Sequence, residues 1–199
     1  MDLQISVFLL FVLFTAGHSL RCYECMSQTG SCAGQTERTC PSGSTHCESS
    51  TGITKVGDIT SKVQAKGCVP VCQNGSINFG LVRTATSCCN RDLCNRQDAP
   101  EPSNVPNGKK CYTCDGQSCS AILSCSGDED RCVTATDTSG SLTAMVKGCI
   151  SKSFCDATTA VRNVVSVSCC SGNLCNGSQS VSQSFLFLCC SLLSYFLLH

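Results

Sequence analysis

The chain has 199 residues, of which 22 are cysteine, with no tryptophan and only 6% aromatic residues. Its formal net charge at pH 7 is zero, which excludes the strongly basic surface typical of nucleic-acid-binding proteins. A cysteine content this high is typical of small extracellular domains that disulfides stabilise in place of a large apolar core.

Residues 1–19 predict a secretory signal peptide. An unbroken apolar run from Val7 to Phe14 is followed by the small residues Gly17 and Ser19, which suit a cut that leaves Leu20 first. The run is too short to span a membrane. One feature departs from the usual pattern, since the segment before the run holds Asp2 and no lysine or arginine. The signal directs the chain to a compartment where disulfides form.

One cysteine pattern then occurs twice, in residues 20–95 and 111–176. The openings read RCYEC (21–25) and KCYTC (110–114), and the closings read CCNRDLCN (88–95) and CCSGNLCN (169–176). A shorter match, AKGC (65–68) and VKGC (146–149), lies between them. The repeat predicts two copies of one small disulfide-stapled domain.

The segment between the copies, residues 96–110, holds three prolines and no cysteine, which predicts an exposed, partly extended linker. Within each copy, runs of β-forming residues flank turn candidates at Val56-Gly57-Asp58 and at Asp137-Thr138-Ser139-Gly140. No segment shows a sustained helical period, and the third loops, 81–87 and 161–168, are rich in valine and threonine. The sequence therefore predicts an all-β, disulfide-rich chain.

Residues 177–199 predict the removable propeptide of a glycosylphosphatidylinositol (GPI) anchor. The small triplet Asn176-Gly177-Ser178 precedes a polar spacer, 179–184, and a short apolar tail, 185–198. The tail is too short for a transmembrane helix and has no basic flank. Asn176 fits best as the attachment residue, and Gly177 and Ser178 are the alternatives. Palmitoylation of a retained tail at Cys189 and Cys190 is the competing interpretation.

Ten cysteines per copy, with these openings and closings, a signal peptide and a GPI tail, resemble the lymphocyte-antigen-6/urokinase-receptor (LU) family, whose three-finger fold is shared with snake neurotoxins. The resemblance implies two tandem three-finger domains, each with a closing asparagine, Asn95 or Asn176, that packs into the disulfide-rich base, the palm. It also implies ten bridges: Cys22–Cys47, Cys25–Cys32, Cys40–Cys68, Cys72–Cys88, Cys89–Cys94, Cys111–Cys132, Cys114–Cys119, Cys125–Cys149, Cys155–Cys169 and Cys170–Cys175.

The remaining motifs predict neither a cofactor, a metal nor an enzyme. Zinc is the rival explanation for each Cys-x-x-Cys, but His46 is the one histidine between the predicted signal peptide and tail, which favours disulfides and leaves no catalytic set. Asp128-Glu129-Asp130 does not fit a calcium loop and predicts a solvated loop. Asn74-Gly75-Ser76 is an N-glycosylation sequon.

These features predict a GPI-anchored binding protein on the outer leaflet of the plasma membrane, reached through the secretory pathway. Its partner is an extracellular or cell-surface protein, met by the loop tips Thr54–Thr60, Thr136–Ser141 and Gln73–Gly80. Phe79 is the one large apolar residue near a tip, and either an anchor or a packing role fits it. The alternative is a soluble secreted inhibitor of the two-domain phospholipase A2 inhibitor type. Urokinase binding is disfavoured, because that receptor encloses its ligand with three domains.

Overall fold

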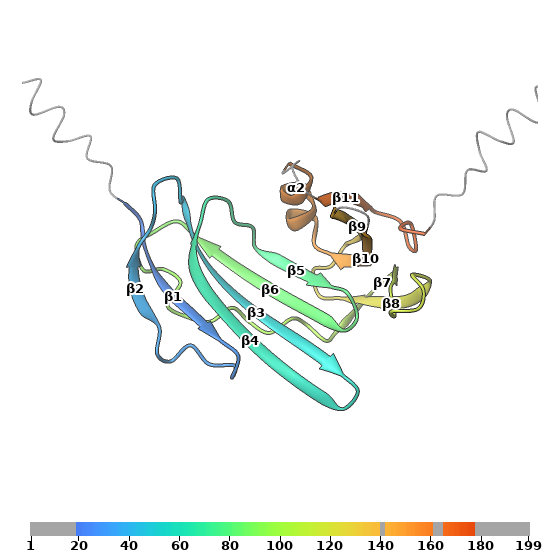
Figure 1. Cartoon of the computed structure of the whole chain (residues 1–199), viewed down its shortest axis with the longest axis horizontal. Helices are drawn as coiled ribbons and strands as arrows, with labels where there is room; N and C mark the ends of the chain where they lie inside the picture. Colours follow the sequence, from blue (N-terminus) through green and yellow to red (C-terminus); the bar gives the residue numbers. More distant parts are fainter. Residues whose placement is uncertain (1–18, 140–141, 161–164, 178–199) are drawn as a thin grey trace, which may run out of the picture.

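Each copy of the cysteine pattern folds into one domain. The computed structural model describes residues 19–139, 142–160 and 165–177, and most of these residues form β-hairpins (Figure 1). Nearly all of the predicted signal peptide and of the predicted propeptide lies outside the described residues. No helix among the described residues combines the length and apolar character needed to cross a bilayer.

Domain 1 consists of three antiparallel hairpins, the fingers. Their strands are β1 (Arg21–Ser27) and β2 (Thr36–Thr39), β3 (His46–Val56) and β4 (Ile59–Val69), and β5 (Gly75–Asn78) and β6 (Val82–Cys89). In the longest finger Val56 pairs with Ile59, and Gly57 in the intervening turn has a φ of 60°. A two-residue hairpin turn needs positive φ, which glycine supplies at low cost. The predicted all-β class is confirmed.

Domain 2 repeats this plan with one change, a helix in its third finger. Its elements are β7 (Pro106–Thr113), β8 (Ala121–Ser126), β9 (Arg131–Ser139), β10 (Leu142–Ile150), α2 (Lys152–Ala160) and β11 (Val165–Cys170). The sequence did not predict α2. The Lys152 N–H donates to Asp130 Oδ1 at 2.7 Å, and the Lys152 side chain pairs with Asp156 one turn later. Both contacts support the first turn, and the Asp130 contact comes from another segment.

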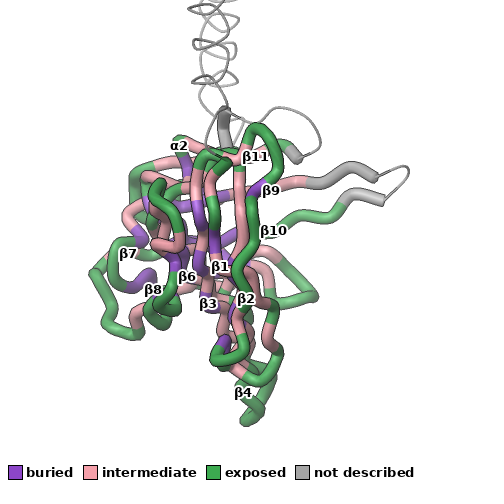
Figure 2. Tube along the Cα trace, turned by 90° about the vertical axis from the view of Figure 1, so that its left-hand side faces the viewer, coloured by how far each residue is buried: buried purple, intermediate pink, exposed green. Residues whose placement is uncertain are grey.

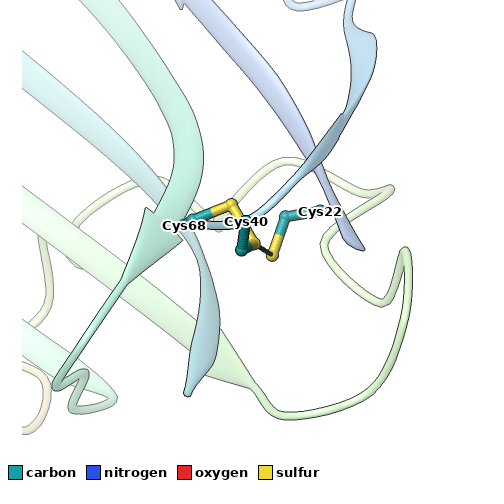
Figure 3. A group of neighbouring side chains, drawn as sticks. All are labelled: Cys22, Cys40 and Cys68. Atoms are coloured by element: carbon teal, nitrogen blue, oxygen red, sulfur yellow. Dashed lines mark hydrogen bonds between the residues drawn. A yellow bond between two sulfur atoms is a disulfide. The ribbon is translucent and has the colours of Figure 1, made fainter. Parts of the chain in front are cut away.

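The core of each domain is made largely of sulfur. The described residues form ten disulfides, five in each domain, and their pairs coincide with those that the family pattern implies. In domain 1 the bridges Cys22–Cys47 and Cys40–Cys68 stack, with 3.2 Å between the sulfurs of Cys22 and Cys40 (Figure 3). Oxidised sulfur carries no hydrogen, so this contact is packing. In domain 2 the equivalent sulfurs, of Cys111 and Cys125, lie 3.3 Å apart.

The closing asparagines hydrogen-bond the end of each domain to its first strand. The Asn95 amide donates to the carbonyls of Tyr23 (2.8 Å) and Glu48 (3.0 Å), and its oxygen accepts from the Tyr23 N–H (2.8 Å). Asn176 makes the same three bonds to Tyr112 and Val133, at 2.8–3.0 Å. A buried amide suits this place because it donates and accepts at once.

The two domains share one continuous sheet. Its nine strands run β11-β9-β10-β5-β6-β3-β4-β1-β2, and the junction is the antiparallel pairing of β5 from domain 1 with β10 from domain 2 (Figure 1). Cys149 pairs with Asn78 and Ile150 with Ile77, and the Ser151 N–H donates to the Ser76 carbonyl at 2.9 Å. The third finger of domain 1 therefore docks on the second finger of domain 2.

An apolar cluster accompanies this junction. The buried residues Val133, Ile150 and Cys155 of domain 2 pack against side chains from both domains, among them Ile77 and Phe79 of domain 1. Backbones also approach closely, because a Cβ on Gly148 would lie 2.1 Å from the Asn78 carbonyl oxygen. The docking thus combines strand pairing with apolar burial.

The linker, for which the sequence predicts an exposed, partly extended segment, is exposed at most of its positions and lies along one face of domain 1. Ala99 is only 6% exposed, and its carbonyl accepts from the Thr51 hydroxyl at 2.7 Å. Lys66, also buried, pairs with Asp98 at 2.8 Å and donates to the Arg96 carbonyl at 2.7 Å. The Thr51 hydroxyl and the Lys66 ammonium thus donate hydrogen bonds to backbone carbonyls of the linker, and the sequence pattern alone does not predict these bonds.

We expect Gly148→Ala to loosen the docking of the two domains. The added methyl group must push β10 away from β5, at a cost of about 1–3 kcal/mol for overpacking. Small-angle X-ray scattering should then give a larger radius of gyration than for the wild type.

The matched control is Gly67→Ala, at the same place in the first AKGC/VKGC copy, where a Cβ would meet nothing within 4 Å. This variant should scatter as the wild type does. Identical curves for Gly148→Ala and Gly67→Ala would contradict the docked arrangement.

Candidate functional site

Four exposed apolar residues of domain 1 lie at the ends of its second and third fingers. Val56 (62% exposed) and Ile59 (75%) flank the β3–β4 turn, and Leu81 and Val82, also exposed, lie in and beside the β5–β6 turn. We call these four residues the tip patch. The long hairpin that carries the first two projects beyond the rest of domain 1, and its end is exposed (Figures 1 and 2).

Strand register places the tip patch on one continuous surface. Val56 pairs with Ile59 across the hairpin, Thr54 pairs with Val82 on the neighbouring strand, and the Lys55 N–H donates to the Leu81 carbonyl at 2.9 Å. Side chains of directly paired residues point to the same face of a sheet. Val56, Ile59 and Val82 therefore lie on the same face.

The linker occupies the opposite face of this sheet. Side chains an odd number of residues apart on a strand point to opposite faces of the sheet. Thr51 therefore lies opposite Thr54 on β3, and Arg83 lies opposite Val82 on β6. Thr51 donates to the linker at Ala99, and Arg83 contacts Asn104. The linker thus covers one face of domain 1, and Val56, Ile59 and Val82 lie exposed on the other.

The other two predicted tips, Gln73–Gly80 and Thr136–Ser141, do not add to the tip patch. Phe79 packs in the apolar cluster between the domains, its N–H donates to the Val82 carbonyl at 2.9 Å, and its carbonyl accepts from the Thr113 hydroxyl at 2.9 Å. Its role is packing, and it is not a free anchor. The segment Thr136–Ser141 lies partly outside the described residues. Val56 and Ile59 lie inside the predicted tip Thr54–Thr60, but the sequence singled out neither of them, because neither is aromatic.

The acidic triplet 128–130, for which the sequence predicts a solvated loop, has one buried member, Glu129, beside the exposed Asp128 and the half-exposed Asp130. Glu129 is 1% exposed, and its Oε2 accepts from the Ser126 N–H (2.8 Å) and from Asn78 Nδ2 (3.3 Å) in domain 1. Burial raises the pKa of Glu129, while those two hydrogen bonds act in the opposite direction. Asp128 accepts a hydrogen bond from the Ser76 hydroxyl, again across the junction. Domain 1 contacts Glu129 and Asp128, which a pattern within one repeat could not indicate.

The sequon at Asn74 sits at the edge of the same junction. Asn74 is exposed, and its Oδ1 accepts from the Cys88 N–H at 2.7 Å. Ser76 is 5% exposed and bonded to domain 2. The hydroxyl that completes the sequon is therefore covered once the domains dock.

Two clusters of three cysteines bring their sulfurs within 4.8 Å of one another, Cys22/Cys40/Cys68 and Cys111/Cys125/Cys149. All six sulfurs are in disulfides. A metal would need thiolates, so it could bind here only after reduction of those bridges. His46 lies in β3 with its Nδ1 2.7 Å from the hydroxyl of its chain neighbour Thr45.

Two stapled three-finger domains define the class of protein, and comparison with known families agrees. The model of the family "Snake toxin and toxin-like protein" matches residues 20–95 and again residues 110–176. The chain belongs to this family and carries two of its domains, as a two-domain LU protein.

The relatives it resembles include receptors and inhibitors. It is 30% identical over 206 residues to the urokinase plasminogen activator surface receptor of Rattus norvegicus, covering 90% of this chain and 62% of the receptor. It is 26% identical over 163 residues to the phospholipase A2 inhibitor PIP of Malayopython reticulatus, covering 73% of this chain and 81% of the inhibitor. The crystal structure of mouse TEX101 matches with a TM-score of 0.33 and 18% identity, over 75% of this chain and 97% of that one. The chain spans about three fifths of the length of the rat receptor.

Proposed function

We propose that the protein is a GPI-anchored, cell-surface binding module that meets an extracellular or cell-surface protein through the tip patch. The observation that carries the proposal is the exposed apolar group at the finger ends, on the face that the linker leaves open. Large apolar side chains that stay exposed on a rigid support are typical of protein contact sites. Similarity to a surface receptor supports the location.

The end of domain 2 suits attachment at Asn176. The Asn176–Gly177 peptide bond is exchanged for an amide between the Asn176 carbonyl and the ethanolamine nitrogen of the anchor. The peptide that begins with Gly177 leaves as a free amine, taking the proton that the ethanolamine nitrogen gives up. The Asn176 side chain takes no part, so it keeps its bonds to the palm. The Gly177 N–H donates to the Leu174 carbonyl at 3.2 Å, and an ethanolamide keeps an N–H at that place.

We expect phosphatidylinositol-specific phospholipase C to release the protein from intact cells that express the full chain with an epitope tag after Leu20. The control variant combines Leu192→Arg with Leu193→Arg, which breaks the apolar tail without touching the folded domains. It should be absent from the surface.

Tag that stays on the cells would contradict the anchor and favour a palmitoylated tail. Tag already in the medium before treatment would favour the second candidate, a secreted inhibitor. Similarity to the phospholipase A2 inhibitor supports that candidate, since it extends over most of that protein.

We propose one N-linked glycan, on Asn74. The second sequon begins at Asn176, whose amide donates to Tyr112 and Val133 inside the palm, so a sugar on that nitrogen would displace those bonds. The Asn74 amide nitrogen donates to no residue that the structure describes, and the residue is exposed.

Asn74→Asp should abolish glycosylation and leave the fold intact, because the carboxylate keeps an acceptor for the Cys88 N–H. The mass of the purified protein before and after N-glycosidase measures this. We expect a mass loss for the wild type and none for the variant. A sugar that remains on Asn74→Asp would place the glycan on Asn176.

Ile59→Lys should weaken partner binding about tenfold or more, because a charge replaces an exposed apolar contact at the centre of the tip patch. A multimer of the secreted form, residues 20–176, is applied to a panel of intact cells and measured by flow cytometry. The control is Ile122→Lys in domain 2, an isoleucine that is 61% exposed and lies outside the patch. Equal loss for both variants, or none for Ile59→Lys, would contradict the assignment of the site.

A further inference from the structure

Lys147, a buried lysine of domain 2, lacks the contacts that the equivalent Lys66 makes in domain 1. Lys66 and Lys147 occupy the same place in the repeated AKGC/VKGC segment. Lys66 holds the chain that leaves domain 1, since its Nζ donates to the Arg96 carbonyl (2.7 Å) and to Gln35 Oε1 (2.6 Å) and pairs with Asp98 (2.8 Å). One lysine thus binds the segment that comes after the closing asparagine.

The backbone leaves domain 2 at Asn176 in the same way as it leaves domain 1 at Asn95. Asn176 makes the palm bonds of Asn95, and the residues two positions earlier, Leu93 and Leu174, share a positive φ of 53° and 56°. The backbone before the exit is therefore set in the same way. A group joined to the Asn176 carbonyl consequently starts out toward Lys147.

Lys147 is 7% exposed, yet no hydrogen bond or ion pair joins its ammonium to any residue that the structure describes. The amide of Gln35 is also missing, because the residue just before β8, where domain 1 has Gln35 before β2, is the exposed Ser120. The Lys147 stem is buried while its ammonium still reaches solvent, since among the described residues only Gln64 Oε1 is a buried polar side-chain atom without a partner. The site is consequently suited to an anion that arrives after Asn176.

We propose that Lys147 binds the phosphate of the ethanolamine bridge that joins the lipid anchor to Asn176. In an ethanolamide of Asn176, the nitrogen and two carbons correspond to the nitrogen, Cα and carbonyl carbon of Arg96. The ester oxygen and the phosphate then fall where the Arg96 carbonyl and the next peptide lie in domain 1, which is the region that Lys66 contacts. A phosphodiester is a permanent anion, and lysine is a common phosphate ligand.

A hydroxyl completes the site. Ser49 in domain 1 donates to the carbonyls of Asn95 (3.4 Å) and Gln97 (3.1 Å), and Thr134 stands at the same place in domain 2, opposite Lys147 as Ser49 is opposite Lys66. Thr134 can therefore donate to the phosphate. The anchor would then hold domain 2 in a fixed orientation to the membrane.

This inference rests on the proposed anchor, and the test separates the two. The full chain is released from cells by phosphatidylinositol-specific phospholipase C, which leaves the ethanolamine phosphate on the protein. It is compared with a secreted form that ends at Asn176. Both are treated with an amine-acetylating reagent under native conditions, and the rate at each lysine is followed by mass spectrometry, which also identifies the C-terminal group.

We expect Lys147 to react about tenfold more slowly in the released form, because a charge-assisted hydrogen bond ties up its amine. Lys66, held in both forms, should be slow in both, and the exposed Lys152 should react equally in both. Equal rates for Lys147, with ethanolamine phosphate present on Asn176, would overturn the inference alone. A released chain without that group on Asn176 would overturn both the attachment site and the inference.

Discussion

Two stacked disulfides at the base of each domain hold the molecule in shape. They bury sulfur where larger domains bury side chains of leucine or phenylalanine, and they join the beginnings and ends of the fingers. Because the base is fixed covalently, the fingers need little core of their own. Exposed valine and isoleucine can then remain at the finger ends without loss of the fold.

The same covalent base explains how two small domains become one body. A finger held at its base presents a free strand edge, and unpaired edges tend to find partners. The β5 edge of domain 1 pairs with β10 of domain 2. Polar side chains at this junction form hydrogen bonds that neither domain could supply by itself. Glu129 and Ser76 are two such groups, since each is buried and each hydrogen-bonds across the boundary. Docking therefore explains the burial of polar residues that a solvated loop would leave exposed.

Much of the fold could be predicted, because repeated cysteines and turn residues are local signals. The all-β class and the two-domain family follow from them, whereas the pairing of ten cysteines required the resemblance to a known family. The contacts that hold the linker and the helix α2 were not predicted, and the sequence left two roles open for Phe79. Each depends on residues far along the chain: Lys66 and Thr51 hold the linker, Asp130 contacts the start of α2, and domain 2 covers Phe79. The tip Thr54–Thr60 was predicted, but its grouping with Leu81 and Val82 was not, because that grouping depends on the pairing of β3 with β6.

The pairing of β5 with β10 makes the two domains one sheet, and hydrogen–deuterium exchange on the native chain measures that pairing without any substitution. The informative backbone amides are those of Asn78, Cys149 and Ser151, whose N–H groups face the partner strand across the junction. A shared sheet predicts that these amides exchange as slowly as those inside the β3–β4 hairpin, since strand pairing protects them. Exchange as fast as that of the exposed turn at Gly57-Asp58 would show that the domains do not share a sheet in solution, and would contradict the docked arrangement.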